Sequence, residues 1–443
     1  MQNPAYHPTP TQRAAMAAFL SGLAVIGVAG AAGWARAAPA PWFGVAVLTF
    51  LAALVYVADR YGRLPAGVRT EGTAFSANQS RGHVAWVLGV LLTALYVLIY
   101  WFPFTLEGLV AVVDPLSRAL RGRPATIAEN GQWFLYGTLY TAAVVVMGVR
   151  ALLKYRHSRY HLVRTCSVIF FQLVVAYLLP QLLVRAGRPE LYFSYFWPLD
   201  YDHIFPSNVD ALRGAGALGT FALFWGVAMI VLATPVLTYF FGKRWYCSWV
   251  CGCGGLAETA GDPYRQLSEK SVRAWQIERW MVHGVLVFVV ATTALLWLDR
   301  SYGLLGSAGH GFARAYGFWI GALFAGVVGV GFYPILGNRV WCRFGCPMAA
   351  ILGLQQRFFS RFRITTNGGQ CISCGNCSTY CEMGIDVRWY AQRGQNVVRA
   401  GCVGCGVCAT VCPRGVLRLE NGPAEGRFGE ARLSPLFEDL DVL

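Results

Sequence analysis

Long apolar runs separated by short basic loops make up the chain as far as Leu336. A helix needs about 20 mostly apolar residues to cross the hydrocarbon core of a bilayer. Eight segments fit this requirement, although the second is short: Met16–Trp34, Trp42–Ala58, Val84–Trp101, Trp133–Leu153, Thr165–Val184, Ala215–Phe240, Trp280–Leu298 and Tyr316–Leu336. The pattern predicts an α-helical polytopic membrane protein with about eight transmembrane helices.

The first segment invites a second interpretation, a cleaved signal peptide. Ala35-Arg36-Ala37 follows the apolar run and resembles a cleavage site. Arg13 is the only charged residue before the run, which is a weak basic start for a signal peptide. We therefore expect residues 1–37 to be retained.

The composition is typical of a membrane protein, and this affects how the positive net charge is interpreted. Of the 443 residues, 56% are hydrophobic and only 13% are charged, where a soluble domain carries about a quarter charged residues. The net charge of +15 lies mostly in short loops between apolar segments. Lysine and arginine in such loops set membrane orientation, so we do not expect nucleic acid as a partner; the partner surface is the lipid bilayer.

The distribution of basic residues predicts the orientation. Loops 59–83, 150–164 and 242–279 together hold 15 Lys and Arg residues. The loops on the other side hold 8, in ranges 35–41, 104–131, 186–213 and 299–314. By the positive-inside rule both termini lie in the cytoplasm, and we expect a multi-pass protein of a bacterial inner membrane.

A cysteine-rich stretch near the C-terminus carries the most specific motif. Between Cys371 and Pro413, the spacing C-x2-C-x2-C-x3-C occurs twice, which is the bacterial ferredoxin run for two [4Fe–4S] clusters. Because the fourth cysteine of each run ligates the other cluster, the spacing predicts two interleaved ligand sets. One set is Cys371, Cys374, Cys377 and Cys412, and the other is Cys402, Cys405, Cys408 and Cys381.

Zinc knuckles or disulfides are the alternatives for these eight cysteines. Two copies of this spacing disfavour zinc, and disulfides need an oxidising compartment, whereas the predicted orientation puts the domain in the cytoplasm. Glu382 follows Cys381 where the run often has proline.

A second cysteine set lies where the sixth and eighth segments end. Each element is aromatic and basic and contains C-x3-C, so the two form an internal repeat: Cys247 with Cys251, and Cys342 with Cys346. Four thiolates suit a third [4Fe–4S] cluster or a single metal ion. A set of thiols without metal is the alternative. Cys253 competes with Cys251 for one ligand position, and the spacing favours Cys251.

The motifs suggest the following division of the chain. We expect N-terminal transmembrane helices with an outside loop, a transmembrane core with the C-x3-C elements, an interfacial linker helix, a double-cluster α+β ferredoxin-like domain, and a tail. Their ranges are 1–130, 131–348, 349–368, 369–420 and 421–443. In the linker, phenylalanines alternate with arginines along Ala349–Ile364, which suits a helix in the membrane interface; a plain basic linker is the alternative.

Together, these features resemble the membrane polyferredoxins of the NapH and NosR type and related oxidase-assembly proteins such as CcoG. The resemblance covers roughly Trp133 to Arg418. Two departures matter. Gly252 follows Cys251 where the family pattern has proline, and a large N-terminal flavin-binding domain of the NosR kind is not seen. A covalent flavin is therefore not implied.

The resemblance implies quinol oxidation, and hence a quinol dehydrogenase-like electron-transfer subunit. We expect electrons to pass between the quinone pool and an unidentified redox partner protein. The alternative is a copper reductase or an assembly factor for a respiratory metalloenzyme. Tyr246, His161, Trp280 and His283 are candidates for contact with a quinone.

Other redox cofactors and functions are disfavoured by what the sequence lacks. Only His283 lies within a predicted span, and C-x-x-C-H and nucleotide-binding motifs do not occur. The spans also lack the paired acids and bases that mark ion pathways. The aromatic stretch Tyr192–Leu199 is expected to form an interfacial belt, or else a docking surface for a partner.

Overall fold

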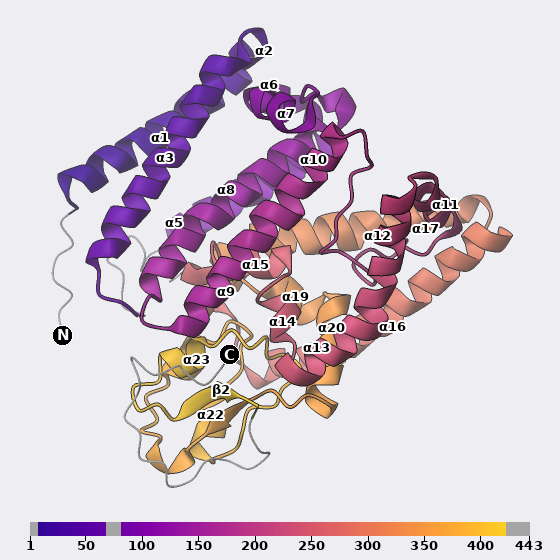
Figure 1. The fold of residues 1–443 in the computed structure, drawn as a ribbon. Coiled ribbons are helices and arrows are strands. Elements are labelled where there is room, and N and C mark those ends of the chain that lie inside the picture. Colours follow the sequence, from indigo (N-terminus) through magenta and orange to yellow (C-terminus); the bar gives the residue numbers. More distant parts are fainter. Residues whose placement is uncertain (1–7, 68–80, 422–443) are drawn as a thin grey trace.

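The computed structural model describes residues 8–67 and 81–421, and within them eight helices are long and apolar enough to cross a membrane (Figure 1). This confirms the predicted fold class. Three of the spans contain a π-helical stretch. The spans are α1 (Pro10–Ala31), α3 (Pro39–Arg63), α5 (His83–Trp101), α8 (Gly131–Lys154), α9–η3–α10 (Arg159–Phe170, Phe171–Leu178, Leu179–Arg185), α12–η4–α13 (Ala217–Ala228, Met229–Ala233, Thr234–Phe241), α16 (Val272–Tyr302) and α17–η6 (Ser307–Tyr316, Gly317–Gly331).

The last two spans begin earlier than predicted. The seventh starts at Val272 and not near Trp280, and the eighth at Ser307 and not near Tyr316. In both, the first turns carry charged residues or histidine, so the helix extends beyond the apolar run from which the span was predicted.

The connections alternate between two ends of the bundle. Short helices gather at the end opposite the C-terminal domain (Figure 1): α2 (Trp34–Ala37), η1 (Pro103–Leu106), α6 (Glu107–Val112), α7 (Asp114–Arg121), η2 (Ile127–Glu129) and α11 (Pro206–Gly214). The described parts of the three basic loops lie at the end that carries the C-terminal domain. The order of loops therefore agrees with the predicted alternation.

One connection at the far end turns back into the bundle. In the stretch Tyr192–Leu199, Phe196 is fully buried, and the Ser194 carbonyl accepts a hydrogen bond of 2.8 Å from the Tyr246 hydroxyl. The Trp197 indole donates to Thr293 in α16. The stretch is thus partly buried in protein, while Tyr192 and Tyr195 are exposed, and the interfacial belt stays a prediction. Non-helical backbone inside a membrane protein is tolerated where protein or a cavity surrounds it, and both do so here.

At the opposite end, short helices follow the sixth and eighth spans and lead into the C-terminal domain. After the sixth come α14 (Arg244–Cys247), α15 (Gly252–Glu258) and η5 (Asp262–Leu267). After the eighth come α18 (Tyr333–Leu336), α19 (Val340–Phe344) and α20 (Pro347–Phe358). One hydrophobic core continues from α14 and α20 into the C-terminal domain.

The C-terminal domain is built on a two-stranded antiparallel sheet. Strand β1 (Arg363–Thr366) pairs with β2 (Leu417–Glu420), with Arg363 opposite Glu420. Four short helices hold the cysteine loops between the strands: η7 (Gly368–Gln370), α21 (Asn376–Thr379), α22 (Val387–Gln392) and α23 (Val407–Thr410).

The linker differs from the helix expected over Ala349–Ile364. Helix α20 ends at Phe358, and the chain enters β1 at Arg363. Most of α20 is buried in protein, although Phe358 and Phe359 are exposed. Phe362 is buried beneath the Arg244 guanidinium, and β1, which pairs with β2, begins at Arg363; the boundary at 369 stays a prediction. Residues 422–443 of the predicted tail lie outside the described residues.

Candidate functional site

The two C-x3-C elements have the same local structure. In each, a short helix ends in a loop, and the second cysteine is the N-cap of the next helix, as Cys251 is of α15 and Cys346 of α20. The Cys251 amide donates to Tyr246 O at 2.8 Å, and the Cys346 amide donates to Trp341 O at 2.9 Å. The sequence repeat is thus also a structural repeat.

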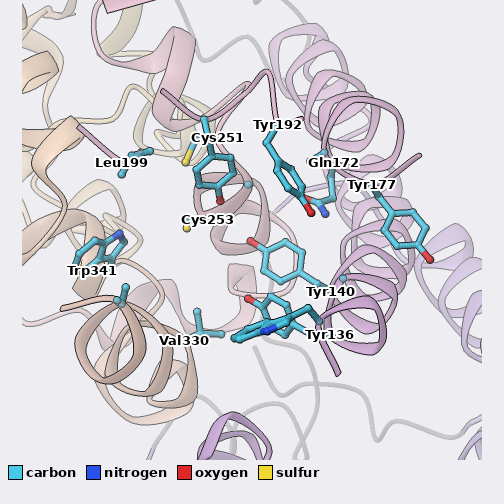
Figure 2. Close-up of a pocket in the computed structure, with 18 of the residues that line it drawn as sticks. Tyr136, Tyr140, Gln172, Tyr177, Tyr192, Leu199, Cys251, Cys253, Val330 and Trp341 are labelled. Carbon is cyan, nitrogen blue, oxygen red and sulfur yellow. The ribbon is translucent and has the colours of Figure 1, made fainter. Parts of the chain in front are cut away.

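The structure brings the thiols of both elements to one large cavity, called the chamber below. Its volume is about 1080 Å³, and Cys253 lines it together with Cys247, Cys251, Cys342 and Cys346. Figure 2 shows Cys251 and Cys253 on one side of the chamber and tyrosines from α8 facing them.

Two opposing effects act on these thiols. Burial raises the pKa of Cys247 to about 12 and also raises the pKa of Cys342 and Cys346, whereas a hydrogen bond with Cys253 lowers the pKa of Cys251 to about 7. Cys247, Cys342 and Cys346 therefore favour the neutral thiol in the absence of a cation, and a coordinated metal deprotonates its thiol ligands. The Arg339 guanidinium lies 3.7 Å from Cys342 Sγ.

The chamber extends from the thiols to the end of the bundle opposite the C-terminal domain. At that end, exposed polar residues line it: Arg123, Glu129, Asn130, Glu190 and Tyr192. Between the two ends its wall is mainly aromatic and apolar, including Tyr96, Phe134, Ile320 and Val330. A ligand with an apolar body can therefore come next to the cysteines.

The eight C-terminal cysteines surround two small separate cavities. Cys371, Cys374, Cys377 and Cys412 line one, and Cys381, Cys402, Cys405 and Cys408 line the other. Each cavity thus takes three cysteines from one run and one from the other.

Matching turns shape the two cysteine loops. Gly375 and Gly406 occupy the same place in the two runs, with φ of 80° and 83°, where a side chain would be strained. Burial raises the pKa of Cys377 to about 12 and that of Cys402 to about 11. Four sulfurs around one small cavity suit an iron–sulfur cluster, so the residues present fit two such groups.

Comparison with known proteins places iron–sulfur domains over all three cysteine regions. The family described as a 4Fe-4S binding domain matches residues 222–271 and 317–365, which contain the two C-x3-C elements. The family described as a 4Fe-4S dicluster domain matches residues 370–417. The chain is a membrane polyferredoxin-like protein.

Two proteins similar to this chain are named as an electron transport protein and a ferredoxin-type protein. The chain is 27% identical to "Putative electron transport protein YccM" of Escherichia coli, over 36% of this chain and 47% of the relative. It is 29% identical to the methylamine utilization ferredoxin-type protein MauN of Paracoccus denitrificans, over 35% of this chain and 56% of the relative. The matches thus span about half the length of these relatives. No solved structure matches the chain significantly.

The loop that holds Cys402 and Cys405 rests directly on the membrane part. Its backbone carbonyls accept hydrogen bonds from side chains of the bundle and of the short helices that join the bundle to the C-terminal domain. Lys243 donates to Ala400, Gln356 to Cys402, Ser248 to Val403, Tyr160 to Gly404 and Arg164 to Cys405. The other cavity lies farther out, and its Cys374 is exposed.

A buried ion network links the two cysteine regions. Glu382 is paired with Arg265 at 2.7 Å and with Arg339 at 3.0 Å, and Arg339 is also paired with Glu258 at 2.7 Å. Burial would raise the pKa of Glu258, but Arg164, Arg265 and Arg339 hold it well below its usual range. The carboxylates of Glu258 and Glu382 lie near Cys405, but these arginines already neutralise them.

The basic residues near the C-x3-C elements divide into two roles. Lys243, Arg244, Arg339 and Arg343 are the basic residues of these elements, and among the described residues only Arg339 of the four contacts a thiol. Lys243 and Arg343 bind Ala400 O and Glu278, and Arg244 stacks on Phe362. These three hold the C-terminal domain and the short helices in place.

Among the four suggested quinone contacts, Tyr246 lines the chamber. His161 is buried against Ser158 and Tyr155, while Trp280 and His283 are exposed on α16. Sequence reasoning missed Tyr140 and Gln172, which also line the chamber, and it noticed Tyr195 only as part of the aromatic stretch Tyr192–Leu199. Their shared position depends on helices and a loop that meet only in the fold.

Proposed function

We propose that this protein passes electrons between the quinone pool and a partner redox enzyme, by way of iron–sulfur clusters. The observation that carries the proposal is the chamber, which has cysteine thiols at one end and an aromatic, apolar wall for the rest of its length. Its volume of about 1080 Å³ is at the upper end of the ordinary range for small-molecule sites, about 300–1,000 Å³. A quinone has a suitable shape, with an apolar tail and a polar ring.

The proposed cluster ligands are those expected from the spacing. Cys371, Cys374, Cys377 and Cys412 would hold one [4Fe–4S] cluster, and Cys402, Cys405, Cys408 and Cys381 the second. Cys247, Cys251, Cys342 and Cys346 would hold a third centre. When bound, such clusters supply one-electron donors and acceptors. The interleaved lining of the two small cavities supports the first two assignments.

The stacking of the parts supports an ordered path for electrons. The chamber thiols adjoin Arg339, Arg339 pairs with Glu382, and Glu382 follows Cys381 in the chain. The cavity that contains Cys374 is the one nearest the surface of the C-terminal domain. A partner enzyme would exchange electrons at that surface. We further propose a bacterial inner membrane with this domain in the cytoplasm, as the basic loops favour.

The deciding experiment uses anaerobically purified protein in detergent. A reduced short-chain quinol should reduce the clusters on a turnover timescale, followed by optical bleaching and EPR. Replacing Cys342 by serine should block that exchange, while dithionite still reduces the C-terminal clusters. If quinol and clusters never equilibrate while Cu(II) is reduced readily, the protein is instead a metal reductase.

A further inference from the structure

Several of the tyrosines that line the chamber already have a hydrogen-bonded hydroxyl. Tyr96 and Tyr136 bond each other at 3.2 Å, and Tyr177 bonds Thr138 at 2.7 Å. Tyr246 donates to the Ser194 carbonyl. Within residues 8–67 and 81–421, no hydrogen bond to the Tyr140 hydroxyl is found, and Figure 2 shows this hydroxyl directed toward Cys253. Tyr140 therefore has an unused polar group facing the chamber.

Two more polar groups meet the Tyr140 hydroxyl above Gly252. A side-chain carbon on Gly252 would lie 3.3 Å from Gln172 Oε1, 3.6 Å from the Tyr195 hydroxyl and 3.7 Å from the Tyr140 hydroxyl. These groups come from three different segments: η3, the loop Tyr192–Leu199 and α8. The Gln172 amide nitrogen donates to Thr141, which fixes the direction of its oxygen.

Gly252 keeps this space open. In the other C-x3-C element the equivalent residue is Pro347, whose ring fills the corresponding position. With no side chain at Gly252, a small group can lie against the backbone between Cys251 and Cys253. The three polar groups and Gly252 thus form a lined notch at the cysteine end of an otherwise apolar chamber.

We propose that this notch, formed by Tyr140, Gln172, Tyr195 and Gly252, binds one oxygen of a quinol ring beside Cys251. The proposal rests on the proposed function and deepens it, because it names the residues that orient the substrate. The Gln172 oxygen accepts the hydrogen bond of a quinol hydroxyl, and the tyrosine hydroxyls can donate to the carbonyl of the oxidised ring.

The reaction proposed at this position is the two-electron oxidation of a quinol. The quinol loses two electrons and two protons and becomes the quinone. The two electrons would be taken up one at a time by two one-electron acceptors, the clusters that the cysteine sets would hold, and the two protons would go to solvent at the end of the chamber lined by exposed Glu129 and Glu190. A ring oxygen held beside Cys251 keeps the donor next to the acceptor end of the chamber.

The first test compares tyrosine variants in the intact, cluster-loaded protein. Tyr140→Phe and Tyr195→Phe should each raise the KM for a short-chain quinol roughly three- to tenfold, the effect of one lost hydrogen bond. Tyr177→Phe is the matched control, because its hydroxyl bonds Thr138 and points away from the chamber (Figure 2). Binding of the oxidised quinone, measured by quenching of tryptophan fluorescence, should weaken by similar factors.

The second test fills the notch. Gly252→Ala should reduce quinone binding at least tenfold, whereas Gly284→Ala, on α16 outside the chamber and with open space around the added carbon, should not. Iron per chain is measured for each variant, so that a lost cluster is not mistaken for lost binding; if Gly252→Ala loses iron, the tyrosine variants decide.

The outcomes separate this inference from the proposed function. If wild-type protein exchanges electrons with quinol, but both tyrosine variants match Tyr177→Phe and Gly252→Ala binds normally, the notch is not the site and the proposed function stands. If wild-type protein neither binds quinone nor exchanges electrons with quinol, both proposals fail.

Discussion

Glu382 shows how one residue couples the two halves of the molecule. It follows Cys381 where ferredoxin runs often have proline, and its side chain is fully buried between Arg265 and Arg339. A buried carboxylate is expensive unless it is paired and hydrogen-bonded, and here Asn338 adds a hydrogen bond of 3.0 Å. The residue that differs from the usual ferredoxin run thus helps to hold the C-terminal domain on the membrane part.

Replacing Glu382 by glutamine should destabilise the docked domain. The change leaves Arg265 and Arg339 short of one negative charge, and removing one partner of a buried pair costs about 3–5 kcal/mol. The loss should appear as a lower midpoint for thermal loss of the cluster signals. Glu107→Gln is the control, because the Glu107 pair with Arg36 is half exposed and such pairs contribute about 0–1 kcal/mol. Equal midpoints for the two variants would contradict the docking role.

The buried ion pairs of Glu258 predict how the stability of the protein depends on pH. Its folded-state pKa lies well below the ordinary value of 4.5, so its contribution to stability is present above pH 4.5 and is lost as pH falls below it. Thermal midpoints measured from pH 7 down to pH 3 should therefore fall steeply at the acid end. Glu258→Gln should be less stable at pH 7 and should lose less on acidification. A wild-type midpoint that stays constant down to pH 3 would contradict this.

At the scale of elements, the structure favours one shared centre for the two C-x3-C loops. Cys247→Ser, Cys251→Ser, Cys342→Ser and Cys346→Ser should each remove the same EPR or Mössbauer component while the ferredoxin signals persist, because all four thiols line one end of one chamber. Cys253→Ser should be milder, since Cys251 holds the repeated N-cap position. Independent, additive losses from the two pairs would instead indicate two thiol sites.

The spans and the cysteine loops were predictable from sequence for physical reasons. A long apolar helix such as α3 is stable mainly in a bilayer. The spacing of Cys371, Cys374 and Cys377 is short enough for one loop to wrap around one cluster. The inward course of the loop Tyr192–Leu199 was not predictable from sequence, because aromatic residues such as Phe196 suit a membrane interface as well as a protein interior. The notch at Gly252 was not predictable either, since it depends on three segments that meet only in the folded chain.

For the whole molecule, the alternation of loops leads to a topology test. A reporter fused after Leu443 should indicate the cytoplasm, and one inserted at Gly306, between α16 and α17, should indicate the opposite side. The reason is the excess of Lys and Arg in the loops at the end that carries the C-terminal domain, 15 against 8. The reverse result at either position would overturn the orientation.

The hydrogen bonds to the loop that holds Cys402 and Cys405 have a consequence for how a partner is met. A ferredoxin that swings on a tether can carry charge across a distance, but here the domain is bonded through five backbone carbonyls to the membrane part. These bonds hold the domain at one place on the membrane part. Under the proposed function, a partner would have to diffuse to the surface near Cys374, and electron transfer could be no faster than those encounters.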